Sequence, residues 1–196
     1  MPEAFPISER VELFAVPGLG EVAAGDRLGT LLCAAMERAG LGWRPGDVLV
    51  VAQKIVSKAE GRLVELAGVE PSPFAVSLAA SLGGPLNKDP RAIEVVLRES
   101  RRIVRMDSGL IIAETHQGYV CANAGVDSSN VPAGFLCLLP VDPDASAARL
   151  REEIRASSGA EISVIISDTF GRPWREGLTN VALGVAGLAP LRSEEH

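Results

Sequence analysis

Aromatic residues are scarce in this chain. Phe, Trp and Tyr make up 4% of the 196 residues, so a surface of aromatic side chains for stacking nucleic-acid bases is not expected. Cationic residues are also fewer than anionic ones: the chain has 19 Lys and Arg and 25 Asp and Glu, which gives a formal net charge of −6. Such a chain lacks the broad basic face that a nucleic-acid duplex or an anionic membrane requires. Nucleic acid and membranes are therefore not expected partners.

Cysteine and histidine are too few for the common disulfide and metal frameworks. Cys33, Cys121 and Cys137 lie in apolar stretches without a CxxC spacing, which predicts buried, unpaired thiols in a reducing cytoplasm. His116 and His196 form no HExxH motif, and a Ser–His–Asp triad would depend on His116 alone. No apolar run approaches the roughly 18 residues of a membrane span, and no signal-peptide pattern is present. The sequence therefore predicts a cytoplasmic location.

The usual nucleotide-binding motifs are absent as well. The sequence contains no GxxxxGK[ST] phosphate loop, and PGLGEVAAG at residues 17–25 lacks the GxGxxG spacing of a dinucleotide-binding turn. Helical stripes and hairpin-like strand pairs are mixed without strict βαβ alternation. This pattern predicts one α+β domain over residues 1–196, with at most two lobes. We expect mixed or antiparallel sheets with flanking helices, neither a Rossmann nor a P-loop fold.

Hydropathy patterns place the expected elements along the chain. Strands are predicted at residues 11–16, 47–56, 109–115, 118–122, 135–139 and 161–166. The run at 47–56 is apolar almost throughout, which predicts burial on both faces of that strand. Helices are predicted to begin after Asp26 and after Asp89, to cover 74–82, and to run from Asp144 to about Ser157. The apolar face of the helix after Asp89 is expected to reach Val104.

Two polar segments that follow apolar strands offer oxygen ligands. Asp127, with Asn123 and Asn130 in the same loop, supplies carboxylate and amide oxygens that suit a hard cation such as Mg²⁺ or Mn²⁺. The alternative for this loop is a simple Asx turn. Asp168 and Thr169 form a second acid and hydroxyl pair, whose alternative is a strand-terminating turn. Two carboxylates that hold divalent ions are a common way to bind nucleotide phosphates without a Walker loop.

Cationic side chains lie near the same predicted strand ends. Residues 53–62 contain Gln53, Lys54, Lys58 and Arg62, which could bind phosphate or form a solvated turn. Arg172 and Arg175 flank Trp174 and could neutralise a carboxylate or a phosphate, or provide only surface charge. Positive charge concentrated in loops that also carry carboxylates favours a polyanionic small molecule as the ligand.

Four segments in order resemble one family, the coenzyme F-420:L-glutamate ligases: VVAQKIVSKAEGR, ANAGVDSSNV, LLPVDPDASA and ISDTFGRPWREGLTNVALGVAG. The resemblance runs from about residue 11 to residue 192. It implies a GTP-dependent ligase that joins L-glutamate to the deazaflavin coenzyme precursor by an amide bond and releases GDP and phosphate. It further implies Mg²⁺ or Mn²⁺, with two ions, stimulation by K⁺, an α+β fold and a homodimer. Family domains continue beyond GLAPL, so we expect the C-terminal extension of the family to be absent.

The resemblance also assigns roles by position. Asp127 would be a metal ligand, and Asp168 with Thr169 would hold metal, as ligands of a second ion. Lys58 would contact the GTP phosphates, and Asp127, Asp168 and Lys58 would carry the catalysis. The remaining GTP contacts implied by the resemblance are Asn130, Gln53 and the early segment Leu19, Gly20, Glu21 and Val22.

The expected reaction proceeds through an acyl phosphate. The substrate carboxylate attacks the γ-phosphate of GTP, and the glutamate amine then displaces phosphate, so catalysis rests on positioning and charge compensation. His116 is a weak candidate for the base, with a structural histidine at a hairpin tip as the alternative. Two other functions stay open at this point: a metal-dependent nucleotide phosphohydrolase, and a non-catalytic module that binds GTP or the coenzyme.

Overall fold

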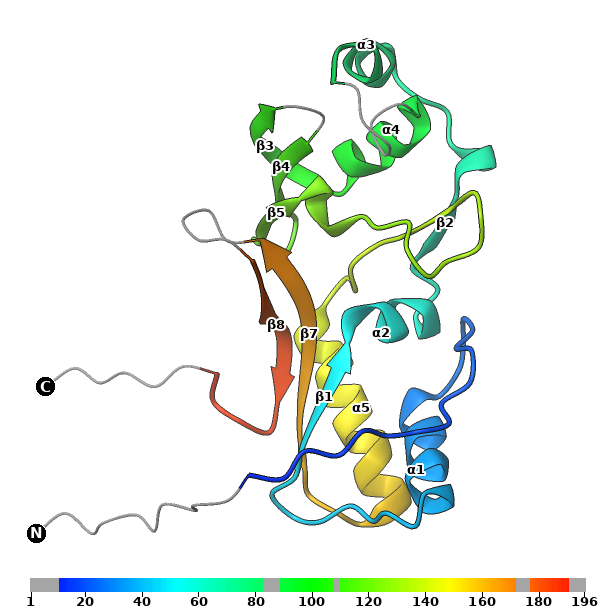
Figure 1. The fold of residues 1–196 in the computed structure, drawn as a ribbon, viewed down its shortest axis with the longest axis vertical. Coiled ribbons are helices and arrows are strands. Elements are labelled where there is room, and N and C mark those ends of the chain that lie inside the picture. Colours follow the sequence, from blue (N-terminus) through cyan, green and yellow to red (C-terminus); the bar gives the residue numbers. More distant parts are fainter. Residues whose placement is uncertain (1–10, 83–88, 108–109, 172–176, 191–196) are drawn as a thin grey trace, which may run out of the picture.

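A computed structural model describes residues 11–82, 89–107, 110–171 and 177–190. One half of the molecule is a three-stranded sheet with helices on one side (Figure 1). Its strands are β1 (Val48–Ala52), β7 (Ser163–Gly171) and β8 (Leu178–Ala186), in the order β1-β7-β8. β1 is parallel to β7, whereas β8 is antiparallel to it. Helix α5 (Pro143–Ser158) packs on β7 and β8, and α1 (Leu28–Arg38) packs on α5.

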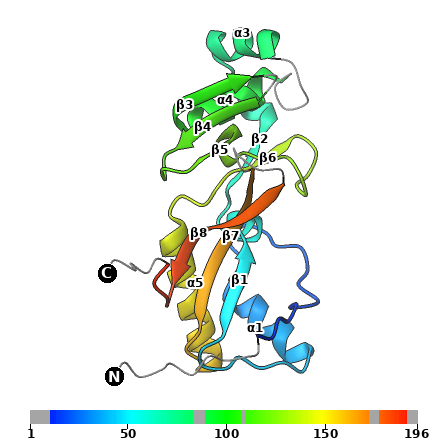
Figure 2. The same cartoon turned by 60° about the vertical axis from the view of Figure 1, so that its left-hand side comes forward.

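The other half contains the antiparallel sheet β3-β4-β5, formed by Ser100–Asp107, Leu110–Thr115 and Val120–Ala122. Helices α3 (Pro73–Leu82) and α4 (Pro90–Arg98) lie beside this sheet, as the view in Figure 2 shows. Between the halves lie α2 (Gln53–Ala59) and a ribbon of β2 (Leu63–Glu65) with β6 (Phe135–Cys137). Two short 3-10 helices, η1 (Leu66–Gly68) and η2 (Asn123–Gly125), complete the elements. Each half has its own hydrophobic cluster, and the predicted α+β class is confirmed.

The predicted strands at 11–16 and 47–56 differ most from the structure. Residues 11–16 form no regular element, and Val11 and Leu13 are exposed, because an alternating pattern becomes a strand only where a neighbouring strand pairs with it. The apolar run at 47–56 is strand only as far as Ala52, after which α2 begins. Within β1, Leu49 and Val51 are buried whereas Val48 and Val50 are exposed. Burial on both faces was therefore a wrong prediction, since the described helices cover one face of this sheet.

Several helix ends also differ by a few residues. Arg27, not Asp26, precedes α1, and the Asp26 carboxylate instead accepts a hydrogen bond from the Ala23 amide at 2.8 Å. Asp89 caps α4 as predicted, by accepting from the Arg91 amide at 2.9 Å. That helix ends at Arg98, so the apolar face does not reach Val104, which lies in β3.

Other local expectations hold. The α3 prediction and the hairpin of β4 and β5 are confirmed, and α5 begins one residue before Asp144. The three cysteines are unpaired, with Cys121 and Cys137 buried and Cys33 half-buried. Among the described helices, none is long and apolar enough to cross a membrane.

Candidate functional site

Helix α2 presents two lysines on one face and is held by a buried polar pair on another. Gln53 and Ser57 are 3% and 0% exposed, and the Ser57 hydroxyl donates to Gln53 Oε1 at 2.9 Å. Residues four apart in a helix share a face, so Lys54 and Lys58 project together, with side chains that are 17% and 15% exposed. The helix therefore offers two ammonium groups from a fixed backbone.

Asp127 is placed by the turn that follows β5. Three consecutive residues of η2 have positive φ, namely Asn123, Ala124 and Gly125, a conformation that turns the chain sharply. Beyond this turn, the Asp127 amide donates to the Cys137 carbonyl at 3.0 Å, and the Cys137 amide donates to the Asp127 carbonyl at 2.8 Å. The backbone of Asp127 is thus anchored to β6, which fixes the position of its carboxylate.

The Asp127 carboxylate contacts both a turn and a cation. Its Oδ1 accepts from the Ser129 amide at 2.9 Å, and its Oδ2 accepts from the Ser129 hydroxyl at 2.6 Å. Lys54 Nζ donates to the same Oδ2 and also to the carbonyl and hydroxyl of Ser129, at 2.7 Å and 2.6 Å. The Asx turn considered as an alternative therefore forms, and it forms together with an ion pair.

These contacts decide the charge of Asp127. Partial burial alone would raise the pKa of this carboxyl group, but the hydrogen bonds from Lys54 and Ser129 outweigh burial and bring the pKa below its usual range. Asp127 is consequently ionised at neutral pH.

Asp168 lies inside β7 rather than after a strand, opposite Val181 of β8. The strand prediction ended at residue 166 because the apolar run ends there and Asp is depleted in strands, whereas pairing with β8 extends β7 to Gly171. Burial raises the pKa of Asp168, and the negative charge of Asp127 raises it further, against opposing contributions from the Thr169 amide and Lys54. Strand pairing agrees with this placement, because Ala52, two residues before Lys54, pairs with Ser167 of β7, and Lys54 is the partner of Asp127.

Thr169 is directed elsewhere. Its hydroxyl donates to Asn180 Oδ1 of β8 at 2.9 Å, and successive side chains of a strand point to opposite faces. The structure therefore brings Asp168, and not the Thr169 hydroxyl, toward Asp127. The thiol of Cys121 in β5, whose pKa burial raises to about 11, is also influenced by the charge of Asp168, which locates Asp168 toward the β5 side.

The early segment at residues 19–22 docks near the end of α2. Leu19 packs against the hydrophobic cluster of the half that contains β1, β7 and β8, and Val22 is buried in the same cluster. The segment is therefore anchored by a residue on each side of Gly20 and Glu21. Glu21 is 93% exposed in its side chain, yet its Oε2 lies 3.2 Å from Lys58 Nζ. Both lysines of α2 are thus paired with a carboxylate in this structure.

Other candidate residues have structural partners or fall outside the described ranges. Arg62 donates to the Leu139 carbonyl at 2.9 Å and to Glu99 at 2.8 Å, so its guanidinium is used in the fold. Nε2 of His116, at the hairpin turn, lies 2.8 Å from the Arg98 carbonyl oxygen. Asn130 has a positive φ of 54° in the Asp127 loop. Arg172, Trp174, Arg175 and His196 lie outside the described residues.

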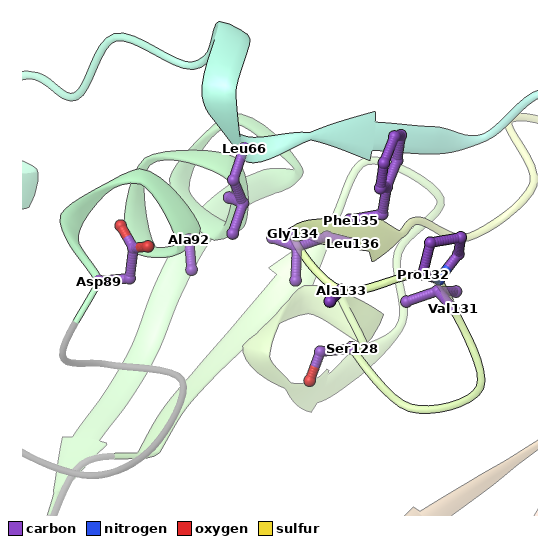
Figure 3. A pocket seen from close by; sticks show the side chains of 10 residues that line it. All are labelled: Leu66, Asp89, Ala92, Ser128, Val131, Pro132, Ala133, Gly134, Phe135 and Leu136. Carbon is purple, nitrogen blue, oxygen red and sulfur yellow. The ribbon is translucent and has the colours of Figure 1, made fainter.

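A pocket of about 270 Å³ lies beside the segment that follows Asp127 in the chain (Figure 3). Ser128 lines it, next in sequence to Asp127, together with apolar residues such as Leu66, Ala92 and Leu136. Neither Lys nor Arg is among the lining residues, and its one carboxylate, Asp89, is bonded to Arg91 at 2.8 Å. A phosphate group would find its cations at α2 and not in this pocket.

The sequence did not predict the link between Lys54 and Asp127. The available signal was that Lys54 and Lys58 are four residues apart, a spacing that places two side chains on one face of a helix. This signal was missed because residues 47–56 were predicted to be a strand. Across the described ranges, no cluster of three or more His, Cys, Asp or Glu is arranged to hold a metal ion.

Comparison with known proteins gives a consistent result. Residues 18–196 match the model of a family described as F420-0:gamma-glutamyl ligase. A coenzyme F420:L-glutamate ligase of Methanothermobacter thermautotrophicus is 45% identical over 92% of this chain and 70% of its own length. The enzymes of the same name from Methanopyrus kandleri and Halorubrum lacusprofundi are 48% and 45% identical, over 90% and 93% of this chain and 66% and 69% of their own lengths.

Proposed function

The chain belongs to the F420-0:gamma-glutamyl ligase family, and we propose that it adds L-glutamate to the coenzyme F-420 precursor at the expense of GTP. The observation that carries this proposal is the convergence of Asp127, Asp168 and the two lysines of α2 from three separate parts of the chain. Carboxylates for divalent cations beside ammonium groups for phosphates are the elements that phosphoryl transfer requires.

The residues fit a divalent cation such as Mg²⁺ or Mn²⁺. After burial, the charge of Asp127 is a further cause that raises the pKa of Asp168, and a cation bound by both carboxylates would offset that effect. Bound there, the ion would supply positive charge to the phosphate oxygens. A second divalent ion, the participation of Thr169, stimulation by K⁺, a homodimer and a cytoplasmic location stay predictions from the sequence.

The GTP phosphates would lie along α2. Lys58 would bind them once Glu21 moves away, and the segment at residues 19–22 would contact the nucleotide beside it. Gln53 is buried and bonded to Ser57, so its contribution would be to hold α2 in position. Asn130, at the end of the Asp127 loop, would contact GTP from the opposite side.

In the reaction, the substrate carboxylate attacks the γ-phosphorus of GTP, forming an acyl phosphate and releasing GDP. The amine of L-glutamate then attacks the acyl carbon, forming the amide bond and releasing phosphate. The protein would orient the reactants and neutralise charge through Lys58 and the carboxylate-bound cation, which are the main contributions in reactions of this type.

The direct test is incubation of the chain with the coenzyme precursor, L-glutamate, GTP and Mn²⁺, followed by mass spectrometry. We expect the precursor to gain the mass of one glutamyl residue, with one GDP formed for each addition. GDP formation that needs neither precursor nor glutamate would instead identify a phosphohydrolase. Stoichiometric GTP binding without any turnover would identify a binding module.

The contact between Glu21 and Lys58 gives a prediction for nucleotide affinity. An exposed ion pair contributes less than about 1 kcal/mol, so Glu21→Gln should strengthen GTP binding by about twofold to fivefold by removing a competitor for Lys58. Binding is measured by calorimetry at low and high salt, and the gain should shrink as salt rises. Glu152→Gln, which alters an exposed pair with Arg155 on α5, is the matched control. Weaker binding by the Glu21 variant would show that Glu21 assists the nucleotide.

A further inference from the structure

Lys54 already occupies the Asp127 carboxylate that the proposed function gives to a divalent cation. Its ammonium group donates to Asp127 Oδ2 and to two oxygens of Ser129, which accounts for all three of its N–H donors. We propose that Lys54 is a resident counterion that competes with the divalent cation for Asp127 and is displaced when that cation binds. The inference rests on the proposed function, because it concerns the same carboxylate.

The hydrogen bonds of Asp127 make the competition direct. Oδ2 accepts from both Lys54 and the Ser129 hydroxyl, and Oδ1 accepts from the Ser129 amide. A cation that binds Oδ2 must remove one of its two donors. A cation on Oδ1 would remain within a few ångströms of the ammonium group, and like charges at that separation repel strongly at a half-buried site. Either geometry favours departure of Lys54.

The charges of the neighbouring groups point the same way. Asp168 is a second carboxylate near Lys54. The positive charge of Lys54 lowers the pKa of Asp168, whereas the negative charge of Asp127 raises it. One ammonium group against two carboxylates leaves an excess of one negative charge. The resident lysine therefore stabilises the site when it holds no metal, and the remaining negative charge still attracts a divalent cation.

Displacement would also give Lys54 a second position. Lys58 lies one helical turn further along the same face of α2, and its partner Glu21 is highly exposed. An ammonium group released from Asp127 can turn along this face toward Lys58. Lys54 would then contact the phosphates that accompany the cation. Its contacts with Asp127 and Ser129 would thus be replaced by contacts with the triphosphate.

The first test measures Mn²⁺ affinity without nucleotide, from the electron paramagnetic resonance signal of unbound Mn²⁺. Lys54→Met and Lys54→Gln should bind Mn²⁺ about tenfold more tightly than the unaltered chain, since the competing charge is gone. Arg155→Gln removes an equal charge from the exposed surface of α5 and should leave the affinity nearly unchanged. A purely structural role of Lys54 predicts the opposite, because a disordered Asp127 loop would bind Mn²⁺ more weakly.

The second test uses the unaltered chain and so does not depend on the folding of a variant. Acylation of lysines by acetic anhydride, followed by mass spectrometry, should show faster labelling of Lys54 when Mn²⁺ is present, since the amine is released. Lys58, which is paired with Glu21 rather than Asp127, is the internal control and should change little.

The outcomes separate the two proposals. Tighter Mn²⁺ binding by the Lys54 variants, together with faster Lys54 labelling, would support displacement. A second outcome is that Asp127→Asn abolishes Mn²⁺ binding, whereas neither Lys54 variant tightens it and Mn²⁺ leaves Lys54 labelling unchanged. That outcome would overturn the inference about Lys54 but would still support the metal site. Mn²⁺ binding that is insensitive to Asp127→Asn would overturn the metal site itself.

Discussion

Asp127→Asn is expected to lower the rate of GTP-dependent glutamate addition by at least about a hundredfold, the usual consequence of removing one charge-stabilising group from a reaction centre. The substitution keeps the size of the side chain and its ability to accept from the Ser129 amide. It removes the negative charge that Lys54 and the proposed cation share. The loss should therefore fall on metal binding and on turnover rather than on the fold.

This prediction is checked by steady-state assays over a range of Mn²⁺ concentrations, with circular dichroism to compare the folds. Excess Mn²⁺ should restore little activity, because an amide oxygen is a weaker ligand than a carboxylate. Asp47→Asn is a suitable control, because Asp47 accepts from the Arg44 amide at 2.8 Å in an exposed turn and has no role in the proposed site. Near-normal turnover by the Asp127 variant would show that the cation binds elsewhere.

The sequence predicted the positions of the chemistry better than its geometry. Asp127, Asp168 and the α2 lysines were each identified from a polar segment beside an apolar strand, because strands hold the adjoining loops in fixed places. Their proximity depends on the parallel pairing of β1 with β7 and on the turn through η2. Lys54 and Asp168, for example, are more than a hundred positions apart in the sequence. Such long-range pairing leaves no periodic signal in a single sequence.

The wrong predictions have a common physical origin. The apolar run at 47–56 and the alternating run at 11–16 were interpreted from local pattern, yet burial depends on what covers each face or edge. In β1 the described helices cover one face, and next to residues 11–16 there is no paired strand in the described chain. In β7 the neighbour β8 had the reverse effect, since its pairing extended the strand through Asp168 and Thr169. The separation of the Thr169 hydroxyl from Asp168 follows from that extension.

Asp168→Asn is expected to have opposite effects on stability and on activity. Burial and the charge of Asp127 raise the pKa of Asp168 in the folded chain. Between the unfolded and folded pKa values the folded state binds more protons than the unfolded state, so stability falls as pH rises through this window. Above the folded pKa the full penalty is present. An uncharged amide removes that penalty, so the variant should be more stable than the unaltered chain at pH 7.

Urea unfolding at several pH values tests the sign of this effect. The stability gained by Asp168→Asn should disappear below about pH 4, where the aspartate is protonated in both states. At pH 7, Mn²⁺ should stabilise the unaltered chain more than the variant, because a cation offsets the repulsion between Asp127 and Asp168. Glutamate addition should fall by about a hundredfold or more at the same time. A variant that is less stable at pH 7 and insensitive to pH would mean that Asp168 is held by favourable contacts, and then the charge repulsion that motivates the cation site would be absent.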